Sequence, residues 1–137
     1  MIEHRTEIRV RYAETDRMGI VYHANYFAWF EIGRTELLRA HGLPYRDLEE
    51  EGFRLPVLEV QARFLKPALY DDVVTVVARL REGPMVRIRI DYEVLARGER
   101  HATGQTVHAF IDSHGVPVRP PAAFAAKMKE LFAAARS

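Results

Sequence analysis

Hydrophobic and polar residues alternate in several stretches of the chain, and this pattern predicts most of its secondary structure. In the first stretch, Ile8, Val10 and Tyr12 alternate with Arg9 and Arg11. Successive residues of a β-strand point to opposite faces, so a period of two places the apolar side chains on one face. We therefore predict a first strand that includes residues 8–12.

The spacing changes between residues 25 and 41, where apolar residues recur at helical intervals. The apolar residues there are Phe27, Ala28, Trp29, Phe30, Ile32, Leu37 and Leu38. Because they cover more than one stripe of a helix, the segment predicts a long helix that is buried on several sides. Gly42 and Pro44 supply a helix stop, and a short acidic helix is expected over residues 45–51, ended by Gly52.

Alternation with a period of two returns after the second helix. It predicts further strands over residues 58–64, 73–80, 86–94 and 103–112. Pro67 ends the first of these strands, and Gly83-Pro84 and Gly98 predict the turns of two hairpins. A proline-rich connector then leads to an alanine-rich helix over residues 122–135.

The order of these elements predicts an α+β fold in a single domain over residues 1–137. Consecutive strands joined by short turns are antiparallel, so we expect a five-stranded antiparallel sheet covered by one long helix, with a C-terminal helix. Chains of this length bury about 68–70% of the surface that their unfolded form exposes, which fits one domain. Such a sheet leaves edge strands with unpaired backbone groups, and pairing with a second copy is the usual remedy. A homodimer is therefore expected.

The composition narrows the range of partners. The chain has 20 Lys and Arg against 19 Asp and Glu, and its formal charge of +1 removes the electrostatic argument for nucleic-acid binding. No apolar stretch reaches the roughly 20 residues of a membrane span, and the first residues lack the apolar region of a signal peptide. We expect a cytoplasmic protein without membrane insertion.

The composition also limits the chemistry. Without cysteine, the chain forms neither disulfides nor a thiolate nucleophile nor a Cys-based zinc site. Most of its histidines are spread along the chain without the spacing of metal ligands, so no metal is expected. These histidines are His4, His41, His101, His108 and His114.

Residues 12–27 combine the groups that an acyl-transfer reaction needs. They form a loop that leads into the long helix and contain a carboxylate, Asp16, and a glycine, Gly19. The first N–H groups of a helix have no intrahelical partner, so they can donate to a developing oxyanion, and the helix dipole adds in the same direction. Because Gly19 lets the loop bend back, Asp16 is able to lie beside these donors.

Each of these residues also has a purely structural interpretation. Asp16 is able to cap the loop or to lie at the surface, and His23 to bond a backbone group at the helix start. Glu31 lies within the apolar helix, where Arg34 at i+3 is an available ion-pair partner. On the same interpretation the aromatic residues of the segment belong to the core: Tyr22, Tyr26, Phe27, Trp29 and Phe30.

A family resemblance follows from these residues. The run Thr15-Asp16, then Met18 to Tyr26 (MGIVYHANY), then Phe30-Glu31 and Arg34-Thr35-Glu36 resembles the signature of hotdog-fold acyl-CoA thioesterases of the 4-hydroxybenzoyl-CoA thioesterase class. Within that class it is most similar to the short-chain acyl-CoA thioesterases associated with the Tol–Pal system, which share the Val-Tyr-His-Ala step. The similarity continues through residues 64–72 and covers most of the chain outside the terminal helix.

The resemblance implies specific roles. Asp16 falls on the catalytic carboxylate, acting as nucleophile on the thioester carbonyl or as general base toward water. The backbone N–H of His23 falls on the donor that polarises this carbonyl, and its imidazole is a further acid/base or orienting candidate. Gly19 and Ile20 shape the loop. Further substrate-binding candidates are Tyr22, Tyr26 and Glu31, the last at an acidic position that faces the acyl pocket in aromatic-specific relatives.

Coenzyme A, which is part of the substrate and not a cofactor, needs cationic surface for its phosphates. The candidates are Lys66, Arg63, Arg87 and Arg89, each of which also fits an ordinary solvated strand face. No metal or organic cofactor is required, since a thioester is already electrophilic.

The sequence therefore favours a homodimeric or tetrameric thioesterase that hydrolyses short-chain or aromatic acyl-CoA. The alternative is a non-catalytic module that binds acyl thioesters on the same fold, although a pure binder has no need for Asp16. A hotdog dehydratase or hydratase is a third hypothesis, but it calls for a different Asp/His arrangement. Whether Asp16 forms a mixed anhydride or activates water stays open.

Overall fold

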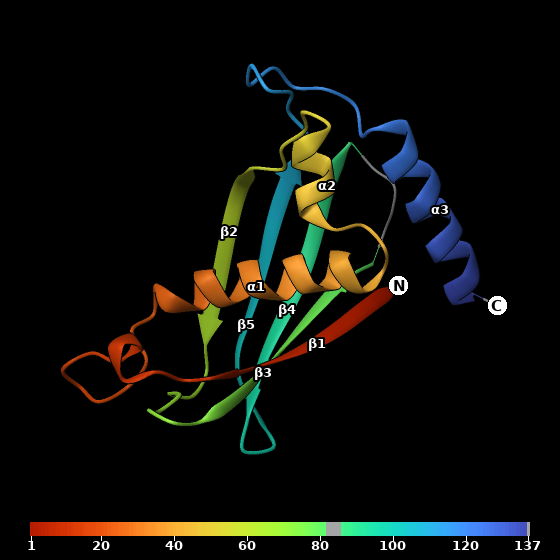
Figure 1. Ribbon diagram of the computed structural model, residues 1–137. Coiled ribbons are helices and arrows are strands. Elements are labelled where there is room, and N and C mark those ends of the chain that lie inside the picture. Colours follow the sequence, from red (N-terminus) through yellow and green to blue (C-terminus); the bar gives the residue numbers. More distant parts are fainter. Residues whose placement is uncertain (82–85, 137) are drawn as a thin grey trace.

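A single antiparallel sheet with one long helix across its face forms the centre of the fold (Figure 1). The computed structural model describes residues 1–81 and 86–136. Its strands lie in the order β1-β3-β4-β5-β2, and all neighbours are antiparallel. They are β1 (Ile2–Arg9), β2 (Val57–Phe64), β3 (Val73–Leu80), β4 (Arg87–Ala96) and β5 (Glu99–Ala109). The predicted five-stranded sheet is confirmed.

Helix α1 (Asn25–Ala40) lies across the sheet and turns one face toward it (Figure 1). Its buried residues recur every three or four positions: Tyr26, Trp29, Phe30, Gly33, Leu37 and Leu38. The predicted burial on several sides is wrong, because Phe27 is 39% exposed and Ile32 is 41% exposed. The sheet covers only one side of the helix, and within residues 1–81 and 86–136 nothing buries Phe27 or Ile32 on the other side.

The helix and the sheet approach each other very closely at Gly104 in β5. A Cβ added at Gly104 would lie 2.4 Å from Cζ of Phe30, far inside van der Waals contact. The Phe30 ring also stacks on Tyr92 of β4 with a centroid distance of 4.4 Å and an interplanar angle of 13°. The absence of a side chain at residue 104 therefore lets Phe30 seat α1 on the sheet.

The first strand differs from the prediction in its position. It covers Ile2–Arg9, whereas Tyr12 belongs to a 3₁₀ turn, η1 (Tyr12–Glu14), and is 77% exposed. The face of β1 toward the helix includes His4 and Thr6, so its beginning lacks a clear apolar alternation. After Arg9 the chain leaves the ladder and enters the loop that precedes α1.

The last strand is also shifted, since it begins at Glu99 and not at residue 103. Ala96 pairs with Glu99, so only Arg97 and Gly98 form the turn, and both have positive φ (51° and 74°). Two residues with positive φ are typical of a type I′ hairpin, whose twist matches that of the strands. The other predicted turn, at Gly83-Pro84, lies outside the described residues.

The remaining helices lie close to their predicted positions. They are α2 (Tyr45–Glu50) and α3 (Ala122–Arg136). Helix α3 buries Phe124, Met128 and Phe132, and Phe124 meets Phe110 edge to face with ring centroids 4.9 Å apart. The C-terminal helix thus closes the end of the core beside the start of β1 (Figure 1).

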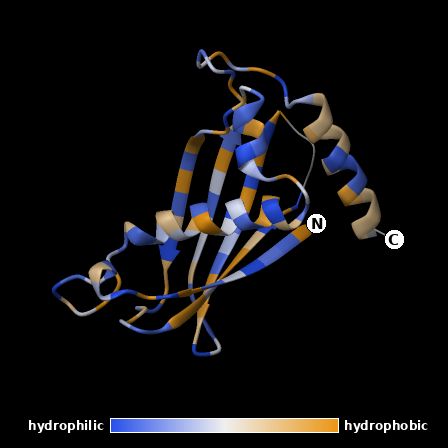
Figure 2. Ribbon diagram, viewed as in Figure 1, coloured by the Kyte–Doolittle hydropathy of each residue, from blue (hydrophilic) through white to orange (hydrophobic). Residues whose placement is uncertain are grey.

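Strand β2 is an edge strand with apolar residues in contact with solvent. Hydrophobic and hydrophilic residues alternate along it (Figure 2), but Val60 is still 42% exposed and Phe64 46% exposed. Helix α1 makes most of its sheet contacts with β1, β3 and β4. It reaches β2 at Phe64, whose ring centroid lies 5.0 Å from that of Tyr26, and leaves much of this edge exposed. A second copy paired along this edge would cover its exposed apolar residues. The homodimer itself stays a prediction.

Candidate active site

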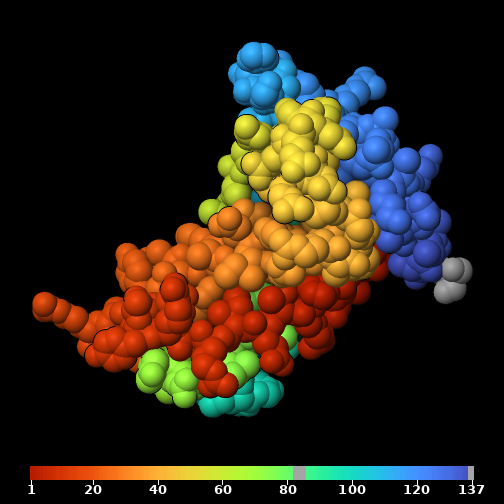
Figure 3. Space-filling model, in the orientation of Figure 1, coloured from red at the N-terminus to blue at the C-terminus, as the bar shows by residue number. Residues whose placement is uncertain are grey.

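Residues 15–24 form a closed loop that projects from one end of the molecule (Figures 1 and 3). The N–H of Asp16 donates to the carbonyl of Ile20 (2.9 Å), and the N–H of Gly19 donates to the carbonyl of Asp16 (3.0 Å). Thr15 and Val21 form a bridge below them. Gly19 has φ of +78°, a left-handed conformation that glycine adopts without strain. The predicted backward bend at Gly19 is confirmed.

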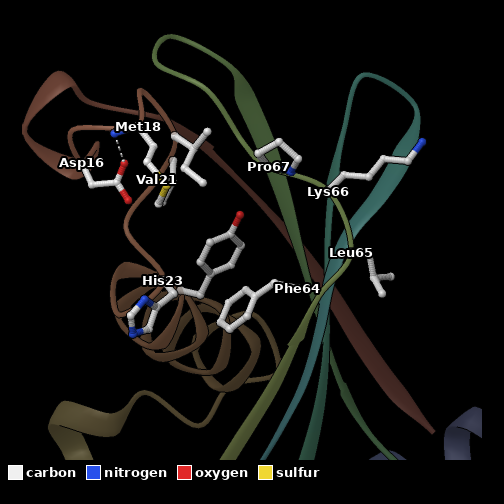
Figure 4. A pocket seen from close by; sticks show the side chains of 10 residues that line it. Asp16, Met18, Val21, His23, Phe64, Leu65, Lys66 and Pro67 are labelled. Atoms are coloured by element: carbon white, nitrogen blue, oxygen red, sulfur yellow. Dashed lines mark hydrogen bonds between the residues drawn. The ribbon is translucent and has the colours of Figure 1, made fainter.

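The carboxylate of Asp16 uses only one of its oxygens inside the loop. Its Oδ1 accepts the N–H of Met18 at 2.8 Å, which closes an Asx-type turn (Figure 4). Within residues 1–81 and 86–136, its Oδ2 has no hydrogen-bond or ion-pair partner. Asp16 can therefore hold the loop through Oδ1 and react through Oδ2, so its structural and chemical interpretations are compatible.

The start of α1 leaves two amides unpaired. The N–H groups of Asn25, Tyr26 and Phe27 donate to carbonyls three residues earlier, at 2.9–3.2 Å. In the part of the chain that the structure describes, no acceptor meets the N–H of His23 or of Ala24. These amides carry the positive end of the helix, so they are suited to an incoming negative charge.

A cavity of about 360 Å³ brings the loop and the helix start together. A volume of this size suits a small molecule or part of one. Figure 4 shows Asp16 and Met18 on one side and residues 64–67 on the other. The lining residues are Asp16, Met18, Ile20, Val21, His23, Tyr26, Phe64, Leu65, Lys66 and Pro67.

The wall opposite Asp16 is held by hydrogen bonds to two neighbouring segments. The carbonyl of His101 in β5 accepts the N–H groups of Leu65 (2.9 Å) and Lys66 (3.1 Å). The N–H of Val21 donates to the carbonyl of Ala68 at 2.9 Å, which ties this wall to the loop that carries Asp16. The two walls of the cavity are thus fixed to each other.

The predicted substrate-binding residues divide between the cavity and its surroundings. Ile20 and Tyr26 line the cavity, whereas Gly19 shapes the loop beside it. Tyr22 is 48% exposed and lies outside the lining, with its ring 4.5 Å from that of His23. Burial raises the pKa of the Tyr26 hydroxyl, which forms a hydrogen bond with the backbone of Ala68. Tyr26 is thus a core residue and a wall of the cavity at once.

The cationic candidates do not converge on the cavity. Lys66 contributes to the lining, but its Nζ lies 2.8 Å from Oε2 of Glu99 and its side chain points away in Figure 4. Arg63 lines a separate polar hollow of about 300 Å³ with Gln61 and Gln105. In the described segments, Arg63, Arg87 and Arg89 form no ion pair.

Glu31 lies in a second cavity and not beside Asp16. This cavity, of about 380 Å³, lies between α1 and β2; it is lined by Phe27, Ala28, Glu31, Arg34, Val57, Val60 and Thr106. Glu31 and Arg34 do not form the ion pair that their i, i+3 spacing allows. Arg34 instead interacts with the hydroxyl of Tyr92.

A buried hydrogen-bond chain continues from Arg34 beneath this second cavity. The Tyr92 hydroxyl lies 2.7 Å from Oγ1 of Thr106, which lies 2.7 Å from Nε2 of His108. Nδ1 of His108 lies 3.3 Å from the carbonyl of Leu55. Burial, assisted by the charge of Arg34, lowers the pKa of His108 to about 4.

The direction of this chain is fixed by its last member. A carbonyl only accepts, so Nδ1 of the neutral His108 carries the proton and Nε2 is an acceptor. Thr106 must then donate to His108, and Tyr92 must donate to Thr106. In every hydrogen bond of the chain, the donor is therefore the group nearer to Arg34 and the acceptor is the group nearer to Leu55.

Sequence reasoning missed Glu14, which the structure buries directly before the loop. Glu14 is 7% exposed, and its carboxylate accepts hydrogen bonds from the N–H of Arg11 and the indole of Trp29. The only local signal is the three-residue spacing between Arg11 and Glu14, which resembles a capping box. Arginine is not a capping residue, so this spacing gave no usable prediction.

Comparisons with known proteins agree with this geometry. A family model described as the thioesterase-like superfamily matches residues 10–130. The chain belongs to this superfamily. Its fold is the hotdog fold of thioesterase structures, as the sequence resemblance implied.

Individual relatives have related names. A Bacillus subtilis (strain 168) protein named "Putative acyl-CoA thioesterase YneP" is 49% identical over 72 residues, which are 53% of this chain and 52% of that protein. The match thus spans about half the length of that relative. A "Putative esterase" of Aquifex aeolicus (strain VF5) is 36% identical over 103 residues, 75% of this chain and 80% of that protein. A DHNA-CoA thioesterase structure from Staphylococcus aureus superposes with a TM-score of 0.90 at 32% identity, covering 99% of this chain and 92% of that one.

The described residues form neither a membrane-spanning helix nor a cluster of metal-ligating side chains. None of the helices is both long enough and apolar enough to cross a membrane. In the same residues, no group of three or more His, Asp or Glu side chains is placed to hold a metal ion.

Proposed function

We propose that this protein hydrolyses the thioester of a short-chain or aromatic acyl-CoA to the free acid and coenzyme A. One observation supports the proposal above the others. Asp16 and His23 line the same cavity, and in the described part of the chain one carboxylate oxygen of Asp16 and the amide N–H of His23 have no hydrogen-bond partner. The names of the Bacillus and Staphylococcus relatives support the same reaction.

In the proposed mechanism, the thioester carbonyl oxygen accepts the N–H of His23 at the start of α1. Negative charge develops on this oxygen when the carbonyl carbon is attacked, and one such donor accounts for about 10²- to 10³-fold in rate. If Oδ2 of Asp16 attacks the carbon, the C–S bond breaks, the CoA sulfur leaves and takes up a proton, and a water then hydrolyses the mixed anhydride. If Oδ2 instead removes a proton from a water, the hydroxyl adds to the carbon, the C–S bond breaks and the proton passes to the CoA sulfur. Both routes end with the carboxylic acid and the CoA thiol, and neither needs a metal or an organic cofactor.

The rest of the substrate is assigned to neighbouring residues. The apolar walls formed by Ile20, Tyr26 and Phe64 suit the acyl or pantetheine chain, with Gly19 and Tyr22 at the margin. Lys66 binds a CoA phosphate in this proposal, after its ammonium leaves the exposed pair with Glu99. Glu31 lies in the cavity next to β2 and contacts the acyl group of substrates that reach it.

We further propose that the protein acts in the cytoplasm as a homodimer or as a tetramer made of two dimers. The apolar residues of edge strand β2 and the exposed side of α1 support this assembly, since a second copy would cover both. The Tol–Pal association implied by the resemblance stays a prediction.

The test is thiol release from a panel of short-chain, long-chain and aromatic acyl-CoAs. Asp16→Asn keeps the acceptor that holds Met18 but removes the negative charge, so kcat should fall by about 10²- to 10⁴-fold. Asp112→Asn is the matched control, because Oδ1 of Asp112 also accepts backbone N–H groups in an exposed turn. Its kcat should equal that of the wild type.

The same panel tests the alternative functions. His23→Ala retains the backbone amide, so it should keep most of the activity if the N–H is the essential donor. Equal kcat in the wild type and Asp16→Asn would refute the role of Asp16. Saturable binding of acyl-CoA without thiol release would instead support a non-catalytic binding module.

A further inference from the structure

We infer that Glu14 is a positioning residue whose buried carboxylate fixes the loop that carries Asp16 and His23. The inference rests on the proposed function, because it concerns the geometry of the same cavity. Glu14 lies two residues before Asp16 and does not line that cavity. It acts, on this inference, only through the residues that it holds.

Four hydrogen bonds converge on Glu14 from three segments of the chain. Its Oε1 accepts the N–H of Arg11 (2.8 Å), and its Oε2 accepts the indole N–H of Trp29 in α1 (3.0 Å). Its backbone carbonyl accepts the N–H of Tyr22 and the side-chain amide of Asn25, both at 2.8 Å. One residue therefore joins the end of the first strand segment, the end of the loop and the long helix.

These contacts lie at the base of the loop, next to both proposed reacting groups. The Glu14–Tyr22 hydrogen bond and the Thr15–Val21 bridge are successive rungs that close the loop. Asp16 is the next residue inside these rungs, and His23 is the next residue outside them. Glu14 thus determines how far the Asp16 carboxylate lies from the His23 amide.

The carboxylate is required at this position because each of its two oxygens faces an N–H group that can donate a hydrogen bond but cannot accept one. The backbone N–H of Arg11 and the indole N–H of Trp29 only donate. Glutamine has the same shape but only one oxygen, so one donor would face an NH₂ group. The Arg11 side chain is 76% exposed, so its ion pair with Glu14 adds little.

The experiment compares full-length wild type with Glu14→Gln, Trp29→Phe and the control Glu51→Gln. Glu51 is an exposed glutamate at the end of α2, outside the cavity. Three quantities are measured: kcat and KM on the acyl-CoA that the wild type cleaves fastest, amide hydrogen exchange of residues 16–23, and the indole NMR resonance. Trp29 is the only tryptophan, so the indole resonance reports directly on the Glu14 contact.

We expect Glu14→Gln to shift the indole resonance and to speed exchange in the loop. Its kcat should fall about 10- to 100-fold, the size of effect that follows a displacement of about 1 Å in reacting groups. KM should change by less than about threefold, because Glu14 does not contact substrate. Trp29→Phe removes the indole donor and should also lower kcat. Glu51→Gln should have the kcat, KM and hydrogen exchange of the wild type.

Each outcome decides the inference. Unchanged exchange in folded Glu14→Gln overturns it, and so does faster exchange with unchanged kcat. If Glu14→Gln does not fold, Trp29→Phe decides, since unchanged exchange and kcat in that variant also overturn the inference. If the wild type cleaves no thioester, the proposed function fails, and hydrogen exchange alone decides whether Glu14 holds the loop.

Discussion

Lowering the pH from 7 to 5 should cost this protein about 2 kcal/mol of unfolding free energy through His108 alone. Burial first, and then the charge of Arg34, lower the pKa of His108 from 6.5 to about 4. Between these two values the unfolded chain binds a proton that the folded chain does not. The contribution is therefore complete above about pH 6.5 and is lost as the pH falls toward 4.

The magnitude follows from the difference between the two pKa values. The shift from 6.5 to about 4 corresponds to a total loss of about 3.4 kcal/mol of unfolding free energy, at about 1.36 kcal/mol per pKa unit. This total loss is reached only below about pH 4. At pH 5 the unfolded histidine is almost fully protonated and the folded one almost neutral, so about 2 kcal/mol is already lost. Ion pairs and hydrogen bonds lower the pKa values of Glu3, Asp72 and Glu93, so these groups respond at lower pH.

Urea unfolding at pH 7 and pH 5, at one protein concentration, measures this loss. His108→Gln keeps one donor and one acceptor but does not titrate, so its free energy of unfolding should change about 2 kcal/mol less than that of the wild type. His114→Gln, in an exposed turn, is the control and should behave as the wild type. An equal loss in His108→Gln and the wild type would refute this account of the buried chain.

Two other variants test the packing and the assembly. Gly104→Ala places a methyl group 2.4 Å from Phe30 and 2.9 Å from the carbonyl of Gln61, so it should lower the free energy of unfolding by about 1–3 kcal/mol, measured in urea. Val60→Asp charges an exposed apolar position of β2 and should halve the mass measured by light scattering without loss of secondary structure. An unchanged mass at or above that of a dimer would exclude pairing through this face.

The sequence predicted the elements whose signal lies within a few neighbouring residues. Strand β4 alternates cleanly because each of its inward residues is buried in the core, and α1 itself follows from its helical spacing. The start of β1 was missed, since His4 and Thr6 interrupt its apolar face. The burial of α1 was overestimated because apolar residues show that a surface needs covering, but not whether the same chain covers it.

The candidate site also contains contacts between residues close in the sequence, which could be predicted, and contacts between distant residues, which could not. Asp16 and His23 lie seven residues apart, so a bent loop followed by a helix start was enough to suggest that they line one cavity. The Glu14–Trp29 contact joins residues 15 apart, and the contact of His108 with Leu55 joins residues 53 apart. Such pairs depend on how the helix and the strands pack, which the alternation of single residues does not encode.

The one-way hydrogen-bond chain from Arg34 to Leu55 also constrains how relatives of this protein can change. Replacing Thr106 by valine would leave the Tyr92 hydroxyl without an acceptor and His108 without a donor, at about 1–3 kcal/mol for each buried group. Phenylalanine at residue 92 together with an apolar residue at 108 would remove both problems at once. Among related sequences, residues 92, 106 and 108 should therefore vary together, as one inherited unit and not as three independent core positions.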